Sequence, residues 1–351
     1  MATVAVLGTG NMGSEVARQL LDAETDLRVW DRTREKAEPL GDAGATVSDS
    51  PADAVDGAGF VITIVAEADA VEQVMTGEDG ALEAMGDDAV WLQMSTVGLE
   101  IDRLAELAGE RGVTLVDAPM LNMKASGDEG ELLVLAAGPE DVRDRCQPVL
   151  DAIGSGTRWV GEVGAASRLK LVLTSWLLGL AEALAETTAL AEALDVEPDR
   201  FLELIEGSPI GVPYAQTKGE QMMKREFVGA FPVRLAFNEA RLIVDAGERN
   251  DLDLALARVV AGQLAVIVGR GYGGEDVAAV FRAVTGETDE PPQTKAEDEE
   301  AAEAESASET EEAESGQTET GQTETEETES EPSGEAGEDS TDDADSSGET
   351  A

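Results

Sequence analysis

The 351-residue chain contains no histidine, one cysteine and only 3% aromatic residues. The lack of histidine excludes histidine-based acid–base catalysis and histidine metal ligands, and we expect no metal site. The single cysteine, Cys146, excludes an intramolecular disulfide and is typical of a reducing cytoplasm. No apolar run is long enough to span a membrane, and the sequence opens directly into a strand pattern without a basic leader. We therefore expect a cytoplasmic protein with no membrane partner.

Basic residues are scarce, with 24 lysines and arginines against 75 acidic residues, for a net charge of −51. Residues 286–351 hold 26 acidic residues and one lysine, so the rest of the chain is strongly acidic as well. Such a composition is typical of a cytoplasm with very high salt, where screening weakens self-repulsion. We expect a halophilic protein, and one that does not bind nucleic acid, whose phosphates would be repelled.

The last segment, residues 286–351, lacks leucine, isoleucine, methionine and all aromatic residues, and repeats GQTET at 316–320 and 321–325. It cannot bury enough apolar surface to offset the entropy of ordering. We expect a disordered acidic tail that either solvates the protein or binds a partner.

The remaining chain shows two patterns. Up to about residue 161, short apolar runs alternate with helical segments such as 11–22 and 99–110; the runs are TVAVLG, DLRVW, FVITIV, AVWLQM, TLVDAP and ELLVLAAG. This alternation predicts a parallel sheet with helices on both faces. Beyond it, helical periodicity dominates over 164–193, 198–206, 232–248, 251–269 and 276–284. We predict an α/β Rossmann-type domain (1–161) and an all-α substrate and oligomerisation domain (162–285), joined by a long interdomain helix.

The first strand ends in a glycine-rich loop, GTGNMG, which opens a helix. Gly8, Gly10 and Gly13 give the G-x-G-x-x-G spacing in its required strand–loop–helix context. The first glycine makes the turn, the second admits a pyrophosphate and the third allows close packing of the helix on the strand. The helix N-terminus would bind the phosphates. The loop predicts dinucleotide binding.

An acidic residue, Asp31, follows the second run 18 residues beyond the last glycine. This is near the distance at which a carboxylate binds the ribose hydroxyls of NAD. Asp31 would repel a 2′-phosphate and so favours NAD, whereas Arg32 and Thr33 could accommodate the phosphate of NADP. The cofactor is NAD or NADP, with Asp31 pointing to NAD.

Over about residues 3–284 the chain resembles the β-hydroxyacid dehydrogenase family, which includes 3-hydroxyisobutyrate dehydrogenases and tartronate-semialdehyde and glyoxylate reductases. The motifs that carry the resemblance are GTGNMG, VAEADAVEQVMTGEDGAL, MSTVG, DAPM, GEVGAASRLKLVLT and GYGGEDVAAVFRA, and the acidic composition suggests a haloarchaeal member. The resemblance implies NAD(P)-dependent exchange of a hydride with a small hydroxy or carbonyl compound. It also implies contacts to the cofactor from Asn11, Met12, Val65, Ala66, Ser95, Thr96 and Asn238, and to the substrate from Leu121, Asn122, Met123, Lys170 and Asp276.

Some family positions are changed in this sequence. The substrate loop continues with Leu121, Asn122 and Met123 where the family has serine and two glycines, and Thr174 replaces an asparagine four residues after the lysine. A lysine that the family carries on a later helix corresponds to Asn238. For Asp276, capping of a helix is an alternative to substrate binding. These changes predict a substrate other than the usual compact 3-hydroxy acids.

Lys170 is the proton-handling residue that the resemblance implies. Thr174, on the same helix face, is the second candidate catalytic residue and could hydrogen-bond the ammonium or the substrate. Lys170 lies in the apolar run LKLVLTSWLL, in a chain that otherwise favours arginine. Lysine can exchange a proton in an apolar setting, whereas arginine stays charged. The alternatives are a lysine that only extends its head to water, and a threonine bonded back to its own helix.

We expect an NAD(P)-dependent dehydrogenase or reductase that acts on a small molecule as a homodimer or homotetramer. An imine reductase of similar architecture and a cofactor-binding regulator without turnover are the alternatives.

Overall fold

The computed structural model describes residues 2–122, 132–229 and 231–288. Its sheet has the strand order β3-β2-β1-β4-β5-β6-β8-β7, and β9 pairs with β8. The pairs from β3 through β6 are parallel, but β8 runs antiparallel to β6 and β7, so the sheet is mixed at this edge. The strands are β1 (Val4–Leu7), β2 (Leu27–Trp30), β3 (Thr46–Val47), β4 (Phe60–Thr63), β5 (Val90–Gln93), β6 (Thr114–Asp117), β7 (Met120–Asn122), β8 (Leu132–Ala137) and β9 (Gly156–Gly161).

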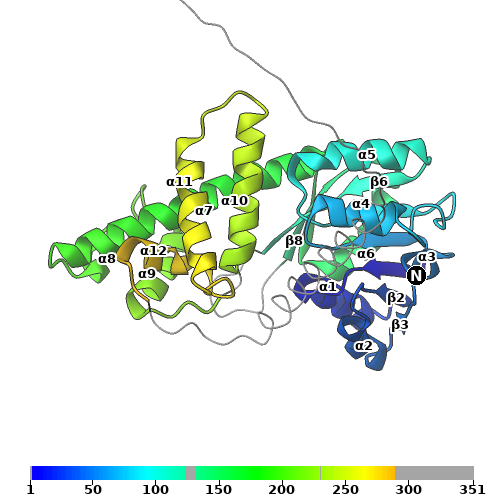
Figure 1. The fold of residues 1–351 in the computed structure, drawn as a ribbon, viewed down its shortest axis with the longest axis horizontal. Coiled ribbons are helices and arrows are strands. Elements are labelled where there is room, and N and C mark those ends of the chain that lie inside the picture. The colour runs from blue at the N-terminus through cyan, green and yellow to red at the C-terminus, as the bar shows by residue number, and fades with distance from the viewer. Residues whose placement is uncertain (1, 123–131, 230, 289–351) are drawn as a thin grey trace, which may run out of the picture. The chain divides into compact units, whose positions relative to one another are not determined.

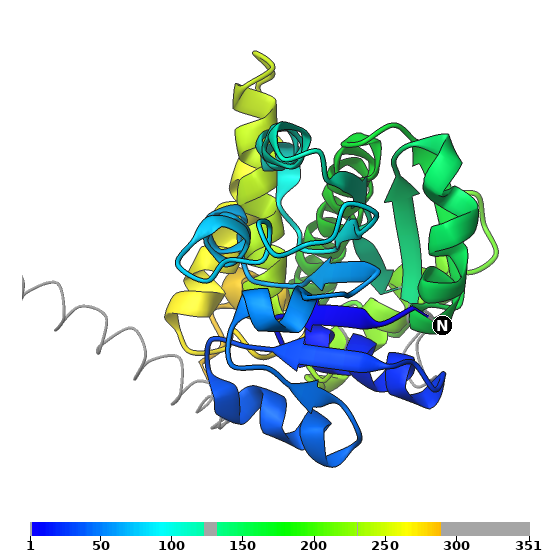
Figure 2. The same cartoon turned by 90° about the vertical axis from the view of Figure 1, so that its right-hand side faces the viewer.

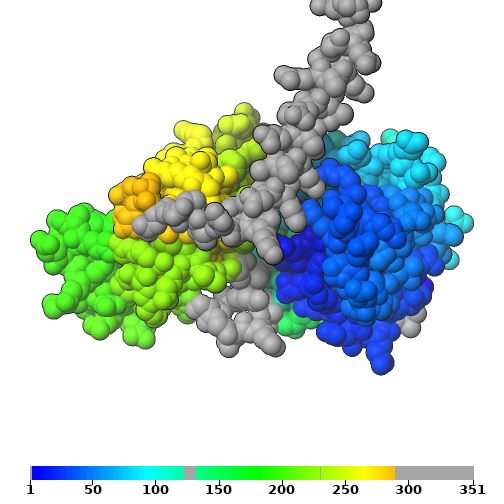
Figure 3. All heavy atoms as spheres, turned by 60° about the horizontal axis from the view of Figure 1, so that its bottom comes forward, coloured from blue at the N-terminus to red at the C-terminus, as the bar shows by residue number. Residues whose placement is uncertain are grey.

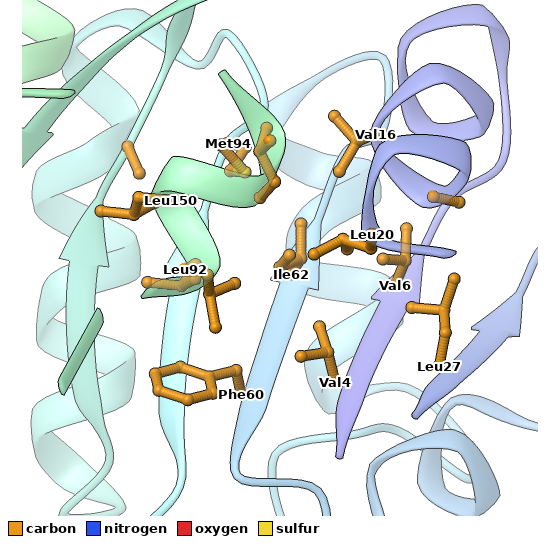
Figure 4. Close-up of a cluster of buried hydrophobic side chains, with 14 of the residues drawn as sticks. Val4, Val6, Val16, Leu20, Leu27, Phe60, Ile62, Leu92, Met94 and Leu150 are labelled. Carbon is orange, nitrogen blue, oxygen red and sulfur yellow. The ribbon is translucent and has the colours of Figure 1, made fainter. Parts of the chain in front are cut away.

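Helices cover both faces of the sheet (Figure 2). Side chains alternate between faces along β1: Val4 and Val6 pack with Val16 and Leu20 of α1 (Figure 4), while Leu7 belongs to the core on the opposite face. Because both faces are buried, these strands are apolar throughout rather than alternating. The helices of this part are α1 (Asn11–Asp22), α2 (Arg34–Asp42), α3 (Pro51–Val55), α4 (Ala68–Thr76), α5 (Ile101–Glu110) and α6 (Arg143–Ile153).

After β9 the described chain is helical and forms a second core (Figure 1). The 29-residue α7 packs against α9, α10, α11 and α12. These elements are α7 (Ala165–Ala193), α8 (Pro198–Ile205), α9 (Pro213–Lys224), α10 (Val233–Glu248), α11 (Ala255–Gly269), the 3₁₀ helix η3 (Val277–Ala279) and α12 (Val280–Thr285). In Figure 3 the α/β part (blue) and the helical part (green to orange) form separate groups of atoms.

The predicted fold class is confirmed: a Rossmann-type sheet precedes a helical region, and α7 connects them. None of the helices in the described ranges is long and apolar enough to cross a membrane. The predicted tail lies outside the described residues, apart from its first three residues, 286–288.

The start of α7 is fixed to the end of β6 by a buried carboxylate. Asp117 accepts hydrogen bonds from the backbone N–H of Ser167, at 2.8 Å, and from its hydroxyl, at 2.7 Å. Burial raises the pKa of Asp117, and the two bonds from Ser167 oppose that shift by stabilising the ionised form. This contact places the first turn of α7, and Lys170 one turn later, at the carboxyl edge of the sheet.

Candidate active site

A cavity of about 1110 Å³ opens at the carboxyl ends of the strands, where ligands bind in sheets of this type. We call it the main cavity. Its walls come from the glycine loop, from the loops after β2, β4 and β5, and from α7, α9 and α10. The predicted residues that line it are Gly8, Gly10, Asn11, Met12, Gly13, Asp31, Arg32, Thr33, Val65, Ala66, Ser95, Thr96, Leu121, Lys170 and Thr174.

The glycine loop has the geometry that its spacing predicts. Gly8 has a φ of +101°, which strongly favours glycine, and a Cβ there would collide with the carbonyl oxygen of Ile64. A Cβ on Gly13 would collide with the carbonyl oxygen of Gly8. A Cβ on Gly10 would meet nothing within 4 Å. Gly8 and Gly13 are therefore required by packing, whereas the space over Gly10 is open to a ligand.

Asp31 ties the second strand to the glycine loop. Its Oδ2 accepts hydrogen bonds from the backbone N–H of Thr9, at 2.6 Å, and from the Thr9 hydroxyl, at 3.1 Å. Its Oδ1 accepts one from the N–H of Thr33, at 2.9 Å. A carboxylate has about four acceptor positions, so one is still available to a ribose hydroxyl. Arg32 and Lys36 also line the main cavity.

The loops after β4 and β5 are joined by Ser95. Its Oγ accepts a hydrogen bond from the N–H of Val65 at 2.9 Å, and the side chain is buried. The next residue, Thr96, lies on the cavity wall and accepts a hydrogen bond from the Nζ of Lys170 at 2.6 Å. Ser95 thus fixes the loop that brings Thr96 to the lysine.

Lys170 is the centre of a buried polar group on the cavity wall. Its Nζ lies 3.0 Å from Oε1 of Glu239, on α10, in addition to its bond to Thr96. The other oxygen of Glu239, Oε2, accepts a hydrogen bond from the Thr174 hydroxyl at 2.8 Å. The expected apolar setting of Lys170 is therefore wrong, since a hydroxyl from the loop after β5 and a carboxylate from α10 contact its ammonium. Thr174 bonds to Glu239 rather than back to its own helix.

Asn238 does not lie where the sequence comparison put it. The structure places it on the exposed face of α10 outside the main cavity, and Glu239 faces the cavity instead. Adjacent residues on an α-helix point about 100° apart, and here Glu239 points to the cavity while Asn238 points to solvent. The structure therefore does not bring Asn238 to the wall of the main cavity, where a contact with the cofactor was expected.

Asp276 also differs from its expected role. It caps η3 by accepting a hydrogen bond from Ala278 N–H at 3.0 Å, which was the alternative. It also forms a buried ion pair with Lys218 and is not part of the cavity wall. Asp276 therefore reaches the cavity wall only through residues it bonds, Lys218 and Phe231.

The altered substrate loop is described only in part. Leu121 lies on the cavity wall and packs on the small cluster of Leu135, Ala137 and Ala166. Asn122 ends β7, and Met123 lies outside the described residues.

Sequence reasoning missed many of the residues that line the cavity, among them Glu239, Tyr214, Lys218 and Gln221. The last three lie on α9, a helix that the sequence analysis did not predict. The one signal for Lys218 was the scarcity of lysine, since it is one of six lysines in the chain.

These walls fit a dinucleotide. The open space over Gly10 lies at the amino end of α1, where backbone N–H groups and the helix dipole favour a phosphate. Asp31, Arg32 and Lys36 line the main cavity, and so do Thr96 and Lys170. Together they define the class of the protein, a nicotinamide-dinucleotide-binding oxidoreductase.

Comparison with known proteins agrees with this class. The family model for the NAD-binding domain of 6-phosphogluconate dehydrogenase matches residues 3–161. The one for the NAD-binding domain of NADP-dependent 3-hydroxyisobutyrate dehydrogenase matches residues 164–284.

Several curated proteins are similar to the chain. An uncharacterized oxidoreductase, YfjR, of Bacillus subtilis is 32% identical over 80% of this chain and 99% of its own length. The 3-sulfolactaldehyde reductase of Escherichia coli is 30% identical over 81% of this chain and 96% of its own. Among solved structures, 3-hydroxyisobutyrate dehydrogenase of Mycobacterium tuberculosis with L-serine has a TM-score of 0.70 and 24% identity, over 81% of this chain and 99% of the other.

The chain therefore belongs to the β-hydroxyacid dehydrogenase family. It is an NAD(P)-dependent oxidoreductase that acts on hydroxy or carbonyl groups of small molecules.

Proposed function

We propose that the protein interconverts a small carbonyl compound and its alcohol, with Lys170 as the proton donor or acceptor. The observation that supports this most is the position of the Lys170 Nζ on the cavity wall, within hydrogen-bond distance of Thr96 and Glu239. When bound, the nicotinamide supplies or accepts the hydride. In reduction, Lys170 donates a proton to the carbonyl oxygen; in oxidation, it accepts the hydroxyl proton.

The neighbours of Lys170 have separate tasks in this proposal. Glu239 is a positioning residue that offsets the charge of the buried ammonium, because an unpaired buried charge is costly. Thr174 fixes the second oxygen of Glu239, and Thr96 directs Nζ toward the cavity. Orientation of this kind contributes to catalysis because the reacting groups need no further reorganisation.

The finer points of cofactor and substrate choice belong to the same proposal. The acceptor position left on Asp31 favours the ribose hydroxyls of NAD over a 2′-phosphate. Leu121 on the cavity wall gives the substrate loop an apolar side chain in place of a hydroxyl, which suits substrates other than compact 3-hydroxy acids. We place the boundary between the Rossmann-type domain and the all-α domain after residue 161, before α7.

The assembly proposed is a homodimer or homotetramer formed through the helical region. α7 exposes Val172 and Trp176, and the adjoining α11 exposes Leu256 and Val259; we call these four residues the apolar face. α11 contains no acidic residue, although the chain has 75. A second copy of such an acidic chain would meet least repulsion on this face. The lone, buried Cys146 and the acidic composition support a reducing, high-salt cytoplasm as the setting.

The test is a panel assay in molar salt. Oxidation of NADH and NADPH is followed with aldehydes, oxo acids and imines as substrates. Turnover of an aldehyde or oxo acid, faster with NADH, is the expected result. Turnover of imines alone, or tight cofactor binding without turnover of any compound, would overturn the proposal.

A further inference from the structure

A buried polar network joins the ends of β4 and β5 next to the loop that carries Thr96. We call it the strand-end network, and its members, all buried, are Thr63, Gln93 and Ser95. The Thr63 hydroxyl donates to Oε1 of Gln93 at 3.3 Å and accepts a hydrogen bond from the indole N–H of Trp91 at 2.8 Å. Neither Thr63 nor Gln93 has a role in the catalytic proposal above, and neither lines the main cavity.

Gln93 holds the backbone of Ser95 at two points. Its Oε1 accepts a hydrogen bond from the N–H of Ser95 at 2.8 Å, and its Nε2 donates to the carbonyl of Ser95 at 3.0 Å. Because each peptide unit is planar, the first bond fixes the unit before Ser95 and the second fixes the unit after it. The two bonds therefore set both soft backbone angles of Ser95, and with them the direction in which the chain continues to Thr96.

The side chain of Ser95 is held from the neighbouring strand end. Its Oγ accepts a hydrogen bond from the N–H of Val65 at 2.9 Å and donates to the carbonyl of Thr63 at 3.3 Å. Bonds that share partners in a buried network strengthen one another and restrict movement. With backbone and side chain both bonded, Ser95 is a fixed base for Thr96, whose Oγ accepts a hydrogen bond from Nζ of Lys170 at 2.6 Å.

A simpler role for Gln93 is to satisfy the buried backbone of Ser95, because buried N–H and carbonyl groups need partners. The end point of the network favours more than that. The carbonyl that Gln93 holds belongs to the peptide unit between Ser95 and Thr96, and Thr96 contacts the proposed proton donor. A displacement of about 1 Å at a reacting group can lower a rate about 10²-fold. A rotation of Ser95 would therefore impair catalysis even where the fold tolerates it.

We propose that Gln93 is a positioning residue of the candidate active site. Its amide fixes the backbone of Ser95, and this directs the Thr96 hydroxyl at Nζ of Lys170. The ammonium is thereby held on the wall of the main cavity before a substrate binds. This inference rests on the proposed function and adds to it a residue that lies outside the cavity wall.

The experiment measures carbonyl reduction by the full chain with NADH in molar salt, using the aldehyde or oxo acid of the panel that the wild type reduces fastest. Gln93→Met fills similar space without an amide, and Gln93→Asn keeps an amide that is one methylene too short to reach both backbone groups. Both variants should lower kcat by about tenfold or more and change KM by less than about threefold, because Gln93 orients a reacting group and does not line the cavity.

The second part of the experiment repeats these substitutions in a Thr96→Val protein. Without the Thr96 hydroxyl, Gln93 has nothing to direct, so either substitution should lower kcat by less than about twofold. Trp91→Phe is the control for stability, because it removes a bond to Thr63 and leaves a cavity but does not remove the bonds from Gln93 to Ser95. Its Tm should fall, whereas its kcat should stay within about twofold of the wild type.

The wild-type kcat in both Gln93 variants would overturn the inference. So would an equal loss of kcat with and without the Thr96 hydroxyl, or a loss in Trp91→Phe as large as in Gln93→Met, since a purely structural role gives these results. Any of them, together with a large loss of kcat in Lys170→Met, leaves the proposed function intact. A Lys170→Met protein that keeps the wild-type kcat would overturn the proposed function instead.

Discussion

Oε1 of Glu239 lies 3.0 Å from Nζ of Lys170, although 68 residues separate them along the chain. Both side chains are buried on the wall of the main cavity. The pair joins α10 to α7, and the hydrogen bond from Nζ to Thr96 joins α7 to the loop after β5. The candidate active site is thus assembled from three distant segments.

Glu239→Gln should lower kcat by about tenfold or more, because a buried ammonium loses the carboxylate that offsets its charge. Cofactor affinity should stay unchanged, since the glycine loop is untouched. Steady-state kinetics would measure kcat, and fluorescence titration with NADH would measure cofactor affinity. Glu239→Asp, which keeps the charge on a shorter side chain, should recover part of kcat. Equal rates for the Gln variant and the wild type would refute a positioning role.

The glycine loop offers a matched pair of variants. Gly10→Ala should leave the fold stable, because the new Cβ meets nothing within 4 Å, but should weaken cofactor binding at least about tenfold by filling the phosphate space. Gly13→Ala should instead destabilise the protein, because its Cβ collides with the carbonyl of Gly8. Thermal unfolding and NADH titration separate the two effects. Normal cofactor affinity in Gly10→Ala would mean that the dinucleotide binds elsewhere.

The spacing of apolar residues and glycines along the sequence was sufficient to predict the main elements of the fold. The helix expected at 11–22 is α1, and that expected at 164–193 begins one residue later as α7. The roles of Gly8 in the turn and of Gly13 in helix packing could be predicted because the strand, the turn and the helix lie within one short segment. The antiparallel pairing of β8 could not be predicted, because it depends on contacts between segments rather than on local pattern.

A residue of the candidate site could be predicted only where it lies within a recognisable sequence motif. Lys170 could be found in this way, but its partners Thr96 and Glu239 come from other elements. The family motif pointed to Asn238 as a cofactor contact. The orientation of α10 about its own axis, which only the structure gives, turns Glu239 to the cavity instead. α9 was missed because its sequence, PYAQTKGEQMMK, has too few apolar residues to show a helical period.

A pH effect on stability is expected from Glu182 on α7. It is buried, neither carboxyl oxygen has a hydrogen-bond partner among the described residues, and burial raises its pKa from 4.5 to about 7. The folded state therefore holds a proton that the unfolded state releases near pH 4.5. The contribution of Glu182 to stability falls as pH rises from about 4.5 to about 7, by about 3 kcal/mol in all.

Glu182→Gln should remove this dependence. Denaturant unfolding in molar salt at pH 5 and pH 8 gives the free energy of unfolding of both proteins. The difference between variant and wild type isolates Glu182 from the many surface carboxylates. The variant should gain stability relative to the wild type between the two pH values; a constant difference would show that Glu182 ionises normally.

The apolar face predicts the effect of a charge on oligomerisation. Trp176 is 66% exposed on α7. Trp176→Glu should convert the oligomer to monomer, because a buried unpaired charge at an interface is costly. Leu204→Glu, on α8 at a position 81% exposed and outside the apolar face, is the control and should leave the oligomer intact. Sedimentation velocity in molar salt would distinguish them. A wild type that is monomeric, or a Trp176 variant that keeps its oligomeric state, would contradict the proposed interface.

The central claim is that Lys170 exchanges the proton with the substrate, and Lys170→Met tests it most directly. Methionine fills similar space without a charge or a proton. The measurement is kcat for carbonyl reduction in molar salt beside the dissociation constant of NADH for the same preparation. We predict a fall in kcat of about 10²- to 10⁴-fold, the usual contribution of a positioned acid, with the dissociation constant unchanged. A variant that binds NADH normally and keeps the wild-type kcat would contradict the claim.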